Sequence, residues 1–131
     1  MPFDWLDKLR GCFYTGIIQN RDSKTKFDIK SADRDLYSGL IRLHILHHAA
    51  QEPIFGLGMA AELARHGYHI SPGTLYPLLH GLEKKGYLRS ASRRNGKSLR
   101  KVYHATARGR KALAAASGKV RELLAELIEG R

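Results

Sequence analysis

Cysteine and long apolar runs are almost absent from this chain, and each scarcity excludes a class of protein. Cys12 is the only cysteine among 131 residues, so neither an internal disulfide framework nor a cysteine-containing zinc finger can form. The longest stretch without formal charge, between Arg65 and Glu83, contains prolines, glycines and histidines, which rule out a membrane span. Asp4 and Asp7 interrupt the N-terminus, so the apolar core of a signal peptide is missing. These absences predict a cytoplasmic protein with no membrane partner.

Acidic residues are also scarce, and their distribution is uneven. The sequence has 23 Lys and Arg residues against 12 Asp and Glu residues, a formal net charge of +11. No carboxylate lies between Glu83 and Glu122, whereas basic residues recur throughout that stretch. Concentrated positive charge is typical of contact with phosphates, because each neutralised phosphate releases counterions. The charge therefore predicts a polyanionic partner; the alternative is a basic surface that only contacts solvent.

The chain is long enough for one compact domain and an appended helix. Residues 1–32 combine apolar positions with a polar run that has no sustained period, which predicts a partly flexible arm and linker with a short amphipathic helix at 3–13. From Asp33 onward the hydrophobic periodicity becomes regular. We therefore expect one compact domain over 33–105 and a C-terminal helix over 106–131.

The two helices expected first in this domain differ in how they are buried. The first begins near Asp33, stops before Pro53, and has apolar residues on so many sides that two of its faces must be covered. Its apolar positions are Leu36, Leu40, Leu43, Ile41, Ile45 and Leu46. The second lies within 54–67 and ends at Gly67. Its expected core positions are Leu57, Ala60, Leu63 and Ala64.

The stretch SPGTLYPLLHGLEKKGYL, which begins at Ser71, predicts a third helix with an unusual start. Ser71 suits the N-cap, and Pro72 suits the first helical position, where its missing N–H costs no hydrogen bond. Pro77 loses one interior hydrogen bond unless the helix begins at Thr74, and both registers remain open. Gly86 ends the helix in either register. Its core-facing positions are Leu75, Leu78, Leu79 and Leu82, and its other side carries Gly73, Thr74, Tyr76, Pro77, His80 and Lys84.

A hairpin and a long helix are expected to follow. Two runs rich in β-branched and aromatic residues, YLRSAS and LRKVYHAT, flank the segment RRNGKS. The Asn95-Gly96 pair in that segment is a strong hairpin signal, so we expect a two-stranded ribbon. Thr106 suits the N-cap of a last helix that ends near Glu129. Apolar residues repeat there at alternating spacings of three and four, a seam that needs another helix to pack on: Leu113, Ala116, Val120, Leu123 and Leu127.

Three helices followed by a basic hairpin predict a mainly α fold with a small β-hairpin, the winged helix-turn-helix, plus a C-terminal dimerisation helix. In this arrangement the third helix enters the major groove of DNA and the hairpin follows the backbone. The start of that helix offers N–H groups to a phosphate, and Gly73 leaves room for it. The residues expected to contact DNA are Ser71, Gly73, Thr74, Tyr76, Pro77, His80, Lys84, Arg93, Arg94, Lys97, Arg100 and Lys101.

The base-reading positions of the third helix are uncharged. Thr74, Tyr76 and His80 can read base edges by hydrogen bonds or by contact with thymine methyl groups. We therefore expect an A·T-containing core site, with a contribution from DNA shape. The alternative for Tyr76 is a ring packed against the wing.

The motifs SPGTLYPLLHGLE, KKGYL, RKVY and TARGRKAL resemble those of the PadR-like transcriptional regulators, over about Leu36 to Arg131. The resemblance implies a homodimer, usually a repressor, which binds a pseudo-palindromic operator and in many members is released by a small molecule. It also implies that the C-terminal helix joins the protomers. One departure is that Phe55-Gly56-Leu57-Gly58 stands where the family often has His-Gly-Tyr-Glu, which puts ligand contacts at those family positions in doubt.

The dimer interface is expected to bury the apolar faces of the first and last helices. Its predicted residues are Leu36, Leu40, Leu43, Leu113, Val120, Leu123 and Leu127. An effector that fits between these helices can change the distance between the two recognition helices and so release DNA. We expect Trp5 and the face from Leu36 to Ile45 to line its site.

Other signals in the sequence are weaker. His44, His47 and His48 have a spacing that can bind a transition metal, but no carboxylate or cysteine matches it, so we favour partly buried, hydrogen-bonded histidines and predict no metal site. No catalytic constellation can be identified, so we expect no enzyme activity and no cofactor. The second hypothesis is a non-specific basic module for RNA or DNA, although paired aromatics for base stacking are lacking. A protein-interaction adaptor is a third, which the basic wing disfavours.

Overall fold

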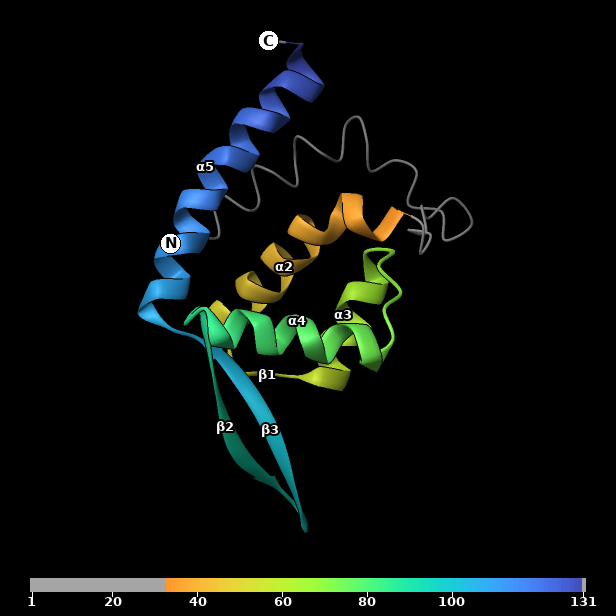
Figure 1. The fold of residues 1–131 in the computed structure, drawn as a ribbon, viewed down its shortest axis with the longest axis vertical. Coiled ribbons are helices and arrows are strands. Elements are labelled where there is room, and N and C mark those ends of the chain that lie inside the picture. Colours follow the sequence, from red (N-terminus) through yellow and green to blue (C-terminus); the bar gives the residue numbers. More distant parts are fainter. Residues whose placement is uncertain (1–32, 131) are drawn as a thin grey trace.

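The described part of the chain follows the predicted order of elements, with one added strand. The computed structural model describes residues 33–130, so the arm and its expected short helix lie outside the described residues. The predicted mainly α fold with a small β-hairpin is confirmed (Figure 1). The elements are α2 (Arg34–Gln51), β1 (Ile54–Phe55), α3 (Gly56–Arg65), α4 (Pro72–Lys84), β2 (Leu88–Asn95), β3 (Ser98–Ala105) and α5 (Ala107–Glu129).

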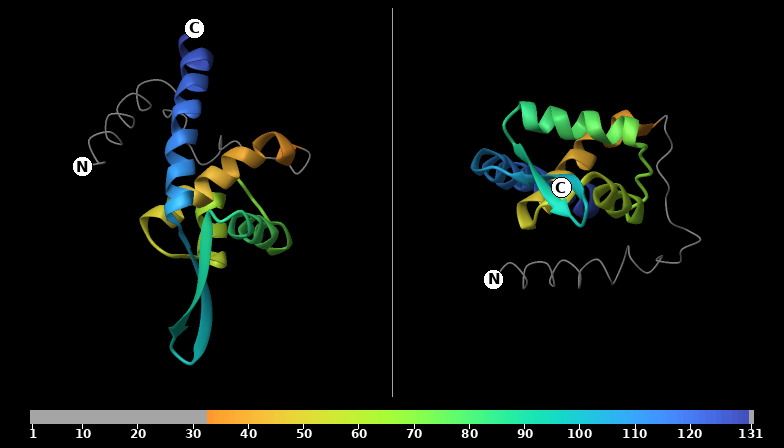
Figure 2. Two further views of the ribbon diagram at one scale, coloured as in Figure 1. Left: turned by 60° about the vertical axis from the view of Figure 1, so that its left-hand side comes forward. Right: turned by 90° about the horizontal axis from the view of Figure 1, so that it is seen from below.

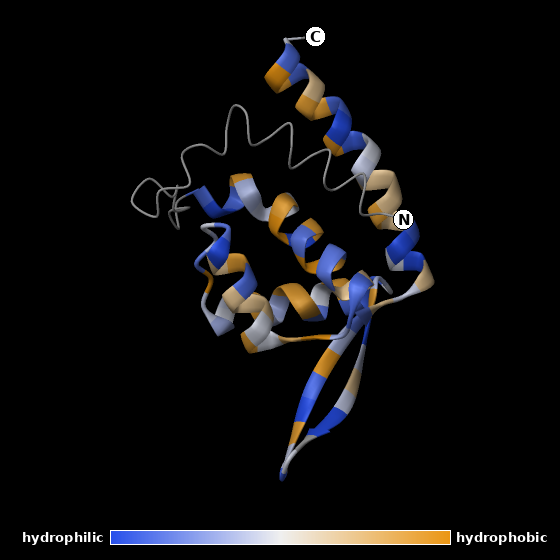
Figure 3. Ribbon diagram, turned by 180° about the vertical axis from the view of Figure 1, so that it is seen from behind, coloured by the Kyte–Doolittle hydropathy of each residue, from blue (hydrophilic) through white to orange (hydrophobic). Residues whose placement is uncertain are grey.

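The hairpin of β2 and β3 and the long helix α5 extend from the helical body in opposite directions. Figure 1 and the left view of Figure 2 show the hairpin leaving the body next to α4, while the C-terminal half of α5 stands away from α2, α3 and α4. Hydrophobic residues recur along that half of α5 (Figure 3). The described part of the molecule therefore presents a basic hairpin at one end and, at the other, an amphipathic helix whose C-terminal half no described element covers.

The core lies among α2, α3, α4 and the body end of the sheet. Ile41, Ile45 and Leu46 are buried as predicted for one side of α2. On α3 the predicted core position Leu57 is wrong, because it is 70% exposed, and Met59 is buried with Leu63 instead. The pairing of β1 with β3 fixes the start of α3, and from that start the i, i+4 pair of Met59 and Leu63 faces the core.

The sheet has three strands, one more than the predicted two-stranded ribbon. Its order is β1-β3-β2, and both pairings are antiparallel. The sequence gives little signal for β1, because Ile54–Phe55 is only two residues long and owes its pairing to distant Val102 and Tyr103. The two-residue turn of the hairpin is Gly96-Lys97, one residue later than the Asn95-Gly96 pair, since Asn95 pairs with Ser98.

Two helices end at the glycines that the sequence indicates. Gly67 and Gly86 have positive φ angles of 88° and 83°, which are accessible to glycine without strain. After α4 the amide of Gly86 donates to Glu83 and the amide of Tyr87 donates to Leu82, the paired hydrogen bonds of a Schellman motif. This motif turns the chain sharply from α4 into β2. It therefore fixes where the wing begins, the wing being the hairpin of β2 and β3.

Candidate nucleic-acid interface

Helix α4 begins at Pro72, which decides between the two registers that the sequence left open. Pro77 therefore lies inside the helix and withholds one hydrogen bond from the carbonyl of Gly73. Leu75, Leu79 and Leu82 are buried beneath it. The opposite side is exposed along its whole length, with Gly73, Tyr76, Pro77, His80 and Lys84 facing solvent.

The N-terminus of α4 is open to an external acceptor. Ser71 is the N-cap as predicted, but its side chain makes no capping hydrogen bond; its Oγ lies 3.3 Å from Oγ1 of Thr74. The amide of Gly73 consequently remains available to a phosphate, and the nearest atom that a Cβ at Gly73 would meet is Ser71 Oγ at 3.8 Å. Gly73 thus leaves a clear path to the helix end.

Arg34 is a candidate DNA-contacting residue that sequence reasoning missed. Its Nη1 donates to Oγ1 of Thr74 across 3.2 Å, from the first residue of α2 to the first turn of α4. The guanidinium places a positive charge at the helix start, where the sequence around Thr74 has none. Thr74 is half-buried, and its hydroxyl accepts from this donor.

Tyr76 lies against the start of α3 and not against the wing. Its hydroxyl and ring approach Gly56 so closely that a Cβ at Gly56 would overlap them. The ring is still 39% exposed, and it lies beside His80 with a centroid distance of 6.4 Å. Gly56 therefore creates the space in which Tyr76 is held, and the Tyr76 and His80 rings lie one turn apart on the exposed side of α4.

The wing carries most of its predicted cations at the surface. Arg93, Arg94 and Lys97 are exposed near the tip of the hairpin. Arg100 is different, because its Cζ lies 4.0 Å from the ring centroid of Phe55, a cation–π contact that holds it against β1. Lys101 is exposed, and its Nζ lies 5.6 Å from the ring centroid of Tyr103.

A carboxylate near the end of α4 fixes the base of the wing. Oε2 of Glu83 accepts from the backbone amide of Ser90 at 2.9 Å and from Ser90 Oγ at 2.6 Å. These hydrogen bonds to Ser90 hold the pKa of Glu83 below its usual value. Glu83 therefore couples α4 to β2, and the two candidate DNA-contacting elements have a defined mutual orientation.

The predicted dimerisation residues form two groups. Leu36 is 76% exposed and Leu40 is also exposed on α2, while Leu43 lines an apolar groove between α2, α4 and α5. On α5, Leu113 packs against the core, whereas the remaining three are uncovered: Val120, Leu123 and Leu127. An apolar seam is thus present on both helices.

Histidines gather at the contact between α2 and α3. The His44 and His66 rings stack with centroids 4.7 Å apart, and Glu62 lies within 3.7 Å of His48 and His66. Burial, together with the neighbouring His66, His48 and His47, lowers the pKa of His44 to about 4. Burial likewise lowers the pKa of His48. The third of the spaced histidines, His47, lies with its ring edge-on to that of His48, at a centroid distance of 5.1 Å, and its Nε2 lies 3.3 Å from Nε2 of Gln51.

These features define the structural class of the protein. A helix-turn-helix unit of α3 and α4 with an exposed outer face, followed by a basic antiparallel hairpin, is a winged helix-turn-helix. Comparison then identifies the family. Residues 45–115 match the model of the "Transcriptional regulator PadR-like family", and the chain belongs to that family. It is accordingly a DNA-binding transcriptional regulator and not an enzyme.

Individual relatives agree with this assignment. The chain is 46% identical over 98 residues to "Transcriptional regulator Rv3488" of Mycobacterium tuberculosis, covering 75% of this chain and 92% of the relative. A PadR family regulator from Eggerthella lenta has 31% identity and a TM-score of 0.64, over 74% of this chain and 86% of that one. A PadR-like regulator from Bacillus cereus has 26% identity and a TM-score of 0.62, over 74% and 99%.

A membrane-spanning helix is not found in the described part of the chain. None of the helices within residues 33–130 combines the length and the apolar character that crossing a bilayer requires.

Proposed function

We propose that this regulator is a dimeric repressor that binds a specific double-stranded operator through α4 and the wing. The observation that carries the proposal is the outer face of α4, where Gly73, Tyr76, Pro77 and His80 are exposed and lie next to an exposed basic hairpin. A neutral face on a helix flanked by cations suits a division in which bases are read by the helix and phosphates are held by the wing.

Base reading is assigned to the surface of Tyr76 and His80. The phenol hydroxyl and the imidazole nitrogens of these side chains can hydrogen-bond to base edges, and their rings can contact thymine methyl groups. Arg34 and the amide of Gly73 are assigned to phosphates at the start of α4. The expected operator contains an A·T-rich core, with shape readout adding to the direct contacts.

Dimerisation is assigned to the apolar faces of α2 and α5. Leu36 and Leu127 are each more than two-thirds exposed, and leucines this exposed on an apolar seam are best explained by a partner that covers them. A two-fold axis through this seam would give two α4 helices for two half-sites about 34 Å apart.

The effector is assigned to the groove between α2, α4 and α5. This groove has a volume of about 480 Å³, and its walls include Leu43 from α2, Pro77 and Leu78 from α4, and Ala112 and Ala116 from α5. It touches both the recognition helix and the helices assigned to dimerisation, so a small apolar ligand there would change their relative position. Trp5, expected beside this site, lies outside the described residues.

Selection from a random duplex library, followed by fluorescence anisotropy at two salt concentrations, tests the proposed function. A pseudo-palindromic, A·T-containing site that binds more tightly than its shuffled counterpart at both salts, with two protomers at saturation, is the expected result. Failure to enrich any sequence, with binding that collapses as salt rises, would favour the alternative of a non-specific nucleic-acid module. Enrichment of G-rich sites would contradict the assignment of base reading to Tyr76 and His80.

A further inference from the structure

Three histidines from two helices converge on one point of the described structure. His44 and His48 lie one turn apart on α2, and His66 is the C-cap of α3. One ring nitrogen from each of the three histidines lies within 4.8 Å of the corresponding nitrogens of the other two. The i, i+4 spacing on α2 presents two imidazoles on one face, and the Schellman motif at the end of α3 holds the third opposite them.

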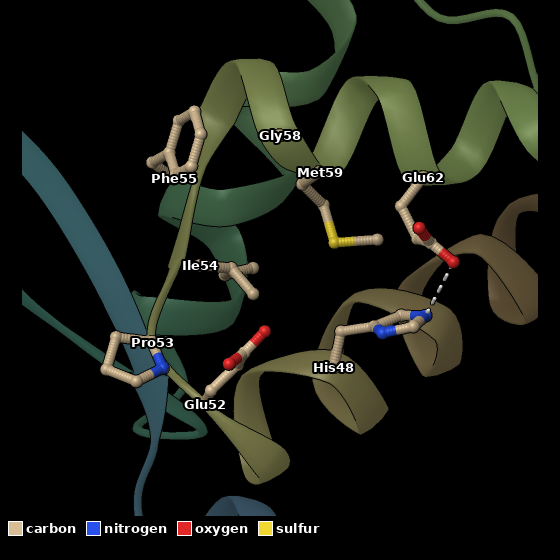
Figure 4. Close-up of a pocket in the computed structure, with 8 residues that line it drawn as sticks. All are labelled: His48, Glu52, Pro53, Ile54, Phe55, Gly58, Met59 and Glu62. Atoms are coloured by element: carbon tan, nitrogen blue, oxygen red, sulfur yellow. Dashed lines mark ion pairs between the residues drawn. The ribbon is translucent and has the colours of Figure 1, made fainter.

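A carboxylate completes the cluster. Oε1 of Glu62 lies 3.7 Å from Nε2 of His48 and 3.7 Å from Nε2 of His66. The other oxygen, Oε2, accepts from Nη1 of Arg65 at 3.2 Å. Arg65 therefore orients the carboxylate so that one oxygen faces the histidines, the kind of support that ligands of a metal commonly have. Figure 4 shows Glu62 of α3 facing His48 of α2.

We propose that His44, His48, His66 and Glu62 bind a divalent transition-metal ion, with zinc the best match to this set of donors. Imidazole nitrogens and a carboxylate oxygen are ligands that zinc uses. Tetrahedral zinc, with bonds of about 2.0–2.1 Å, holds neighbouring donors roughly 3.3 Å apart. The two 3.7 Å separations are already close to that value, whereas the histidine nitrogens lie up to 4.8 Å apart, so binding requires the solvent-accessible His66 and Glu62 side chains to rotate inward.

The cluster is accessible to an ion from solvent. The side chains of His48 and Glu62 are 27% and 29% exposed, and His66 is more exposed than either. A pocket of about 160 Å³ opens against His48 and Glu62, with Ile54 and Met59 on its walls (Figure 4). An ion can reach His48 and Glu62 through this pocket, and the ring of Tyr68 lies beside His44, with centroids 5.4 Å apart.

The set differs from the one that sequence spacing suggested. His47 was the third histidine of that spacing, but its Nε2 lies 3.3 Å from Nε2 of Gln51, and it does not share the cluster. His66 and Glu62 replace it from another helix. A bound ion would cross-link α2 to α3 immediately before the turn into α4, and it would stabilise the folded state because the unfolded chain does not hold these donors together.

Zinc binding to the full-length, untagged and metal-stripped protein tests the proposal. Isothermal titration with zinc chloride should give one ion per chain, and zinc should raise the thermal unfolding midpoint. His66→Ala should weaken zinc binding by at least about tenfold, since it removes one ligand. Glu62→Gln, which keeps the shape of the side chain, should weaken binding as well. The matched control is His104→Ala, which removes a histidine of β3 outside the cluster and should bind zinc as the wild type does.

Circular dichroism of each metal-free variant separates loss of binding from loss of folding, and exposed His66 is the position least able to disturb the core. Absence of stoichiometric binding by the folded wild type would overturn the proposal. Equal affinity in folded His66→Ala and wild type would also overturn it, because the ion would then be held elsewhere. Because no DNA is present in this experiment, its outcome is independent of the proposed operator binding.

Discussion

At the scale of single residues, the hydroxyl of Tyr103 is the least expected feature of the core. The residue is fully buried, and its Oη has no hydrogen-bond partner among the residues that the structure describes. A buried, unpaired hydroxyl costs free energy that its removal restores. Tyr103→Phe should therefore leave the free energy of unfolding unchanged or raise it by up to about 1 kcal/mol, as measured by urea denaturation.

Thr106 offers the contrasting control for that prediction. Its Oγ1 accepts from the amide of Gly109 at 3.0 Å and donates to the carbonyl of Gly86, so both capacities are used. Thr106→Val should lower the free energy of unfolding by about 0.5–2 kcal/mol, the usual cost of removing an N-cap. A marked loss in Tyr103→Phe would show instead that the hydroxyl has a partner.

Residue chemistry near α4 was only partly predictable from the sequence. The exposed positions Gly73, Tyr76 and His80 follow from helical periodicity, because the buried leucines fix the opposite face. Arg34 does not follow, since it reaches Thr74 across 40 positions of sequence. The histidine cluster was missed for the same reason: spacing along one helix says nothing about His66 and Glu62 on the next.

At the scale of elements, the wing is predicted to supply affinity without selectivity. Replacing Arg93, Arg94 and Lys97 by alanine should weaken binding to operator and shuffled duplexes by the same factor. The slope of log affinity against log salt should flatten by roughly one unit per lost phosphate contact. Anisotropy titrations at several salt concentrations measure both quantities.

The double variant of Lys119→Ala and Arg121→Ala is the control for the wing. These cations are exposed on α5, which extends away from the hairpin, so their loss should leave the salt slope nearly unchanged. A wing variant that loses affinity for the operator alone would contradict the assignment of the wing to phosphates.

Helix α5 is fixed to the domain by a close approach of two backbones. A Cβ at buried Gly109 would overlap the carbonyl of Tyr87, the same carbonyl that accepts from the amide of Thr106 at 3.0 Å. Gly109→Ala should lower the free energy of unfolding by about 1–3 kcal/mol, because backbone atoms on both sides must shift. Gly118→Ala is the matched control: a Cβ there meets nothing within 4 Å, and alanine should stabilise the helix by about 0.5–1 kcal/mol.

The sequence predicted elements well where local signals act and poorly where pairing is distant. Glycine stops, the N-caps Ser71 and Thr106 and the hairpin are all local, and each is found. Strand β1 and the phase of α3 depend on β3, about 50 positions later, which no window of the sequence contains. The wrong prediction that Leu57 faces the core is the consequence of that missing information.

At the scale of the whole molecule, the interface residues were predictable as apolar, but their partner was not. Leu113 packs within its own chain, whereas Leu127 lies on the half of α5 that no described element covers. The periodic pattern of apolar residues is the same whether the face packs within its own chain or stays exposed. Periodicity shows that a face is apolar, but it does not show which surface that face contacts.

The proposed dimer yields a prediction at this scale. Leu127→Asp should shift the protein towards monomers, because a carboxylate would have to be buried without a partner in the seam. We expect the dissociation constant of the dimer to rise by at least about a hundredfold, which corresponds to about 2.7 kcal/mol. Leu43→Asp should have the same effect on the α2 side. Sedimentation equilibrium measures the association, and circular dichroism verifies that the variants remain helical.

Leu57→Asp is the control that separates the seam from exposed leucine in general. Leu57 is 70% exposed and Leu127 is 73% exposed, so the two substitutions make the same chemical change at equally accessible positions. Leu57 lies on α3, outside the seam of α2 and α5, and its variant should remain dimeric. If Leu127→Asp also remains dimeric, the protomers join through another surface. The monomer that Leu127→Asp is expected to form should bind a single half-site weakly and the full operator no more tightly. The reason is that the link between two recognition helices is what couples the two half-sites.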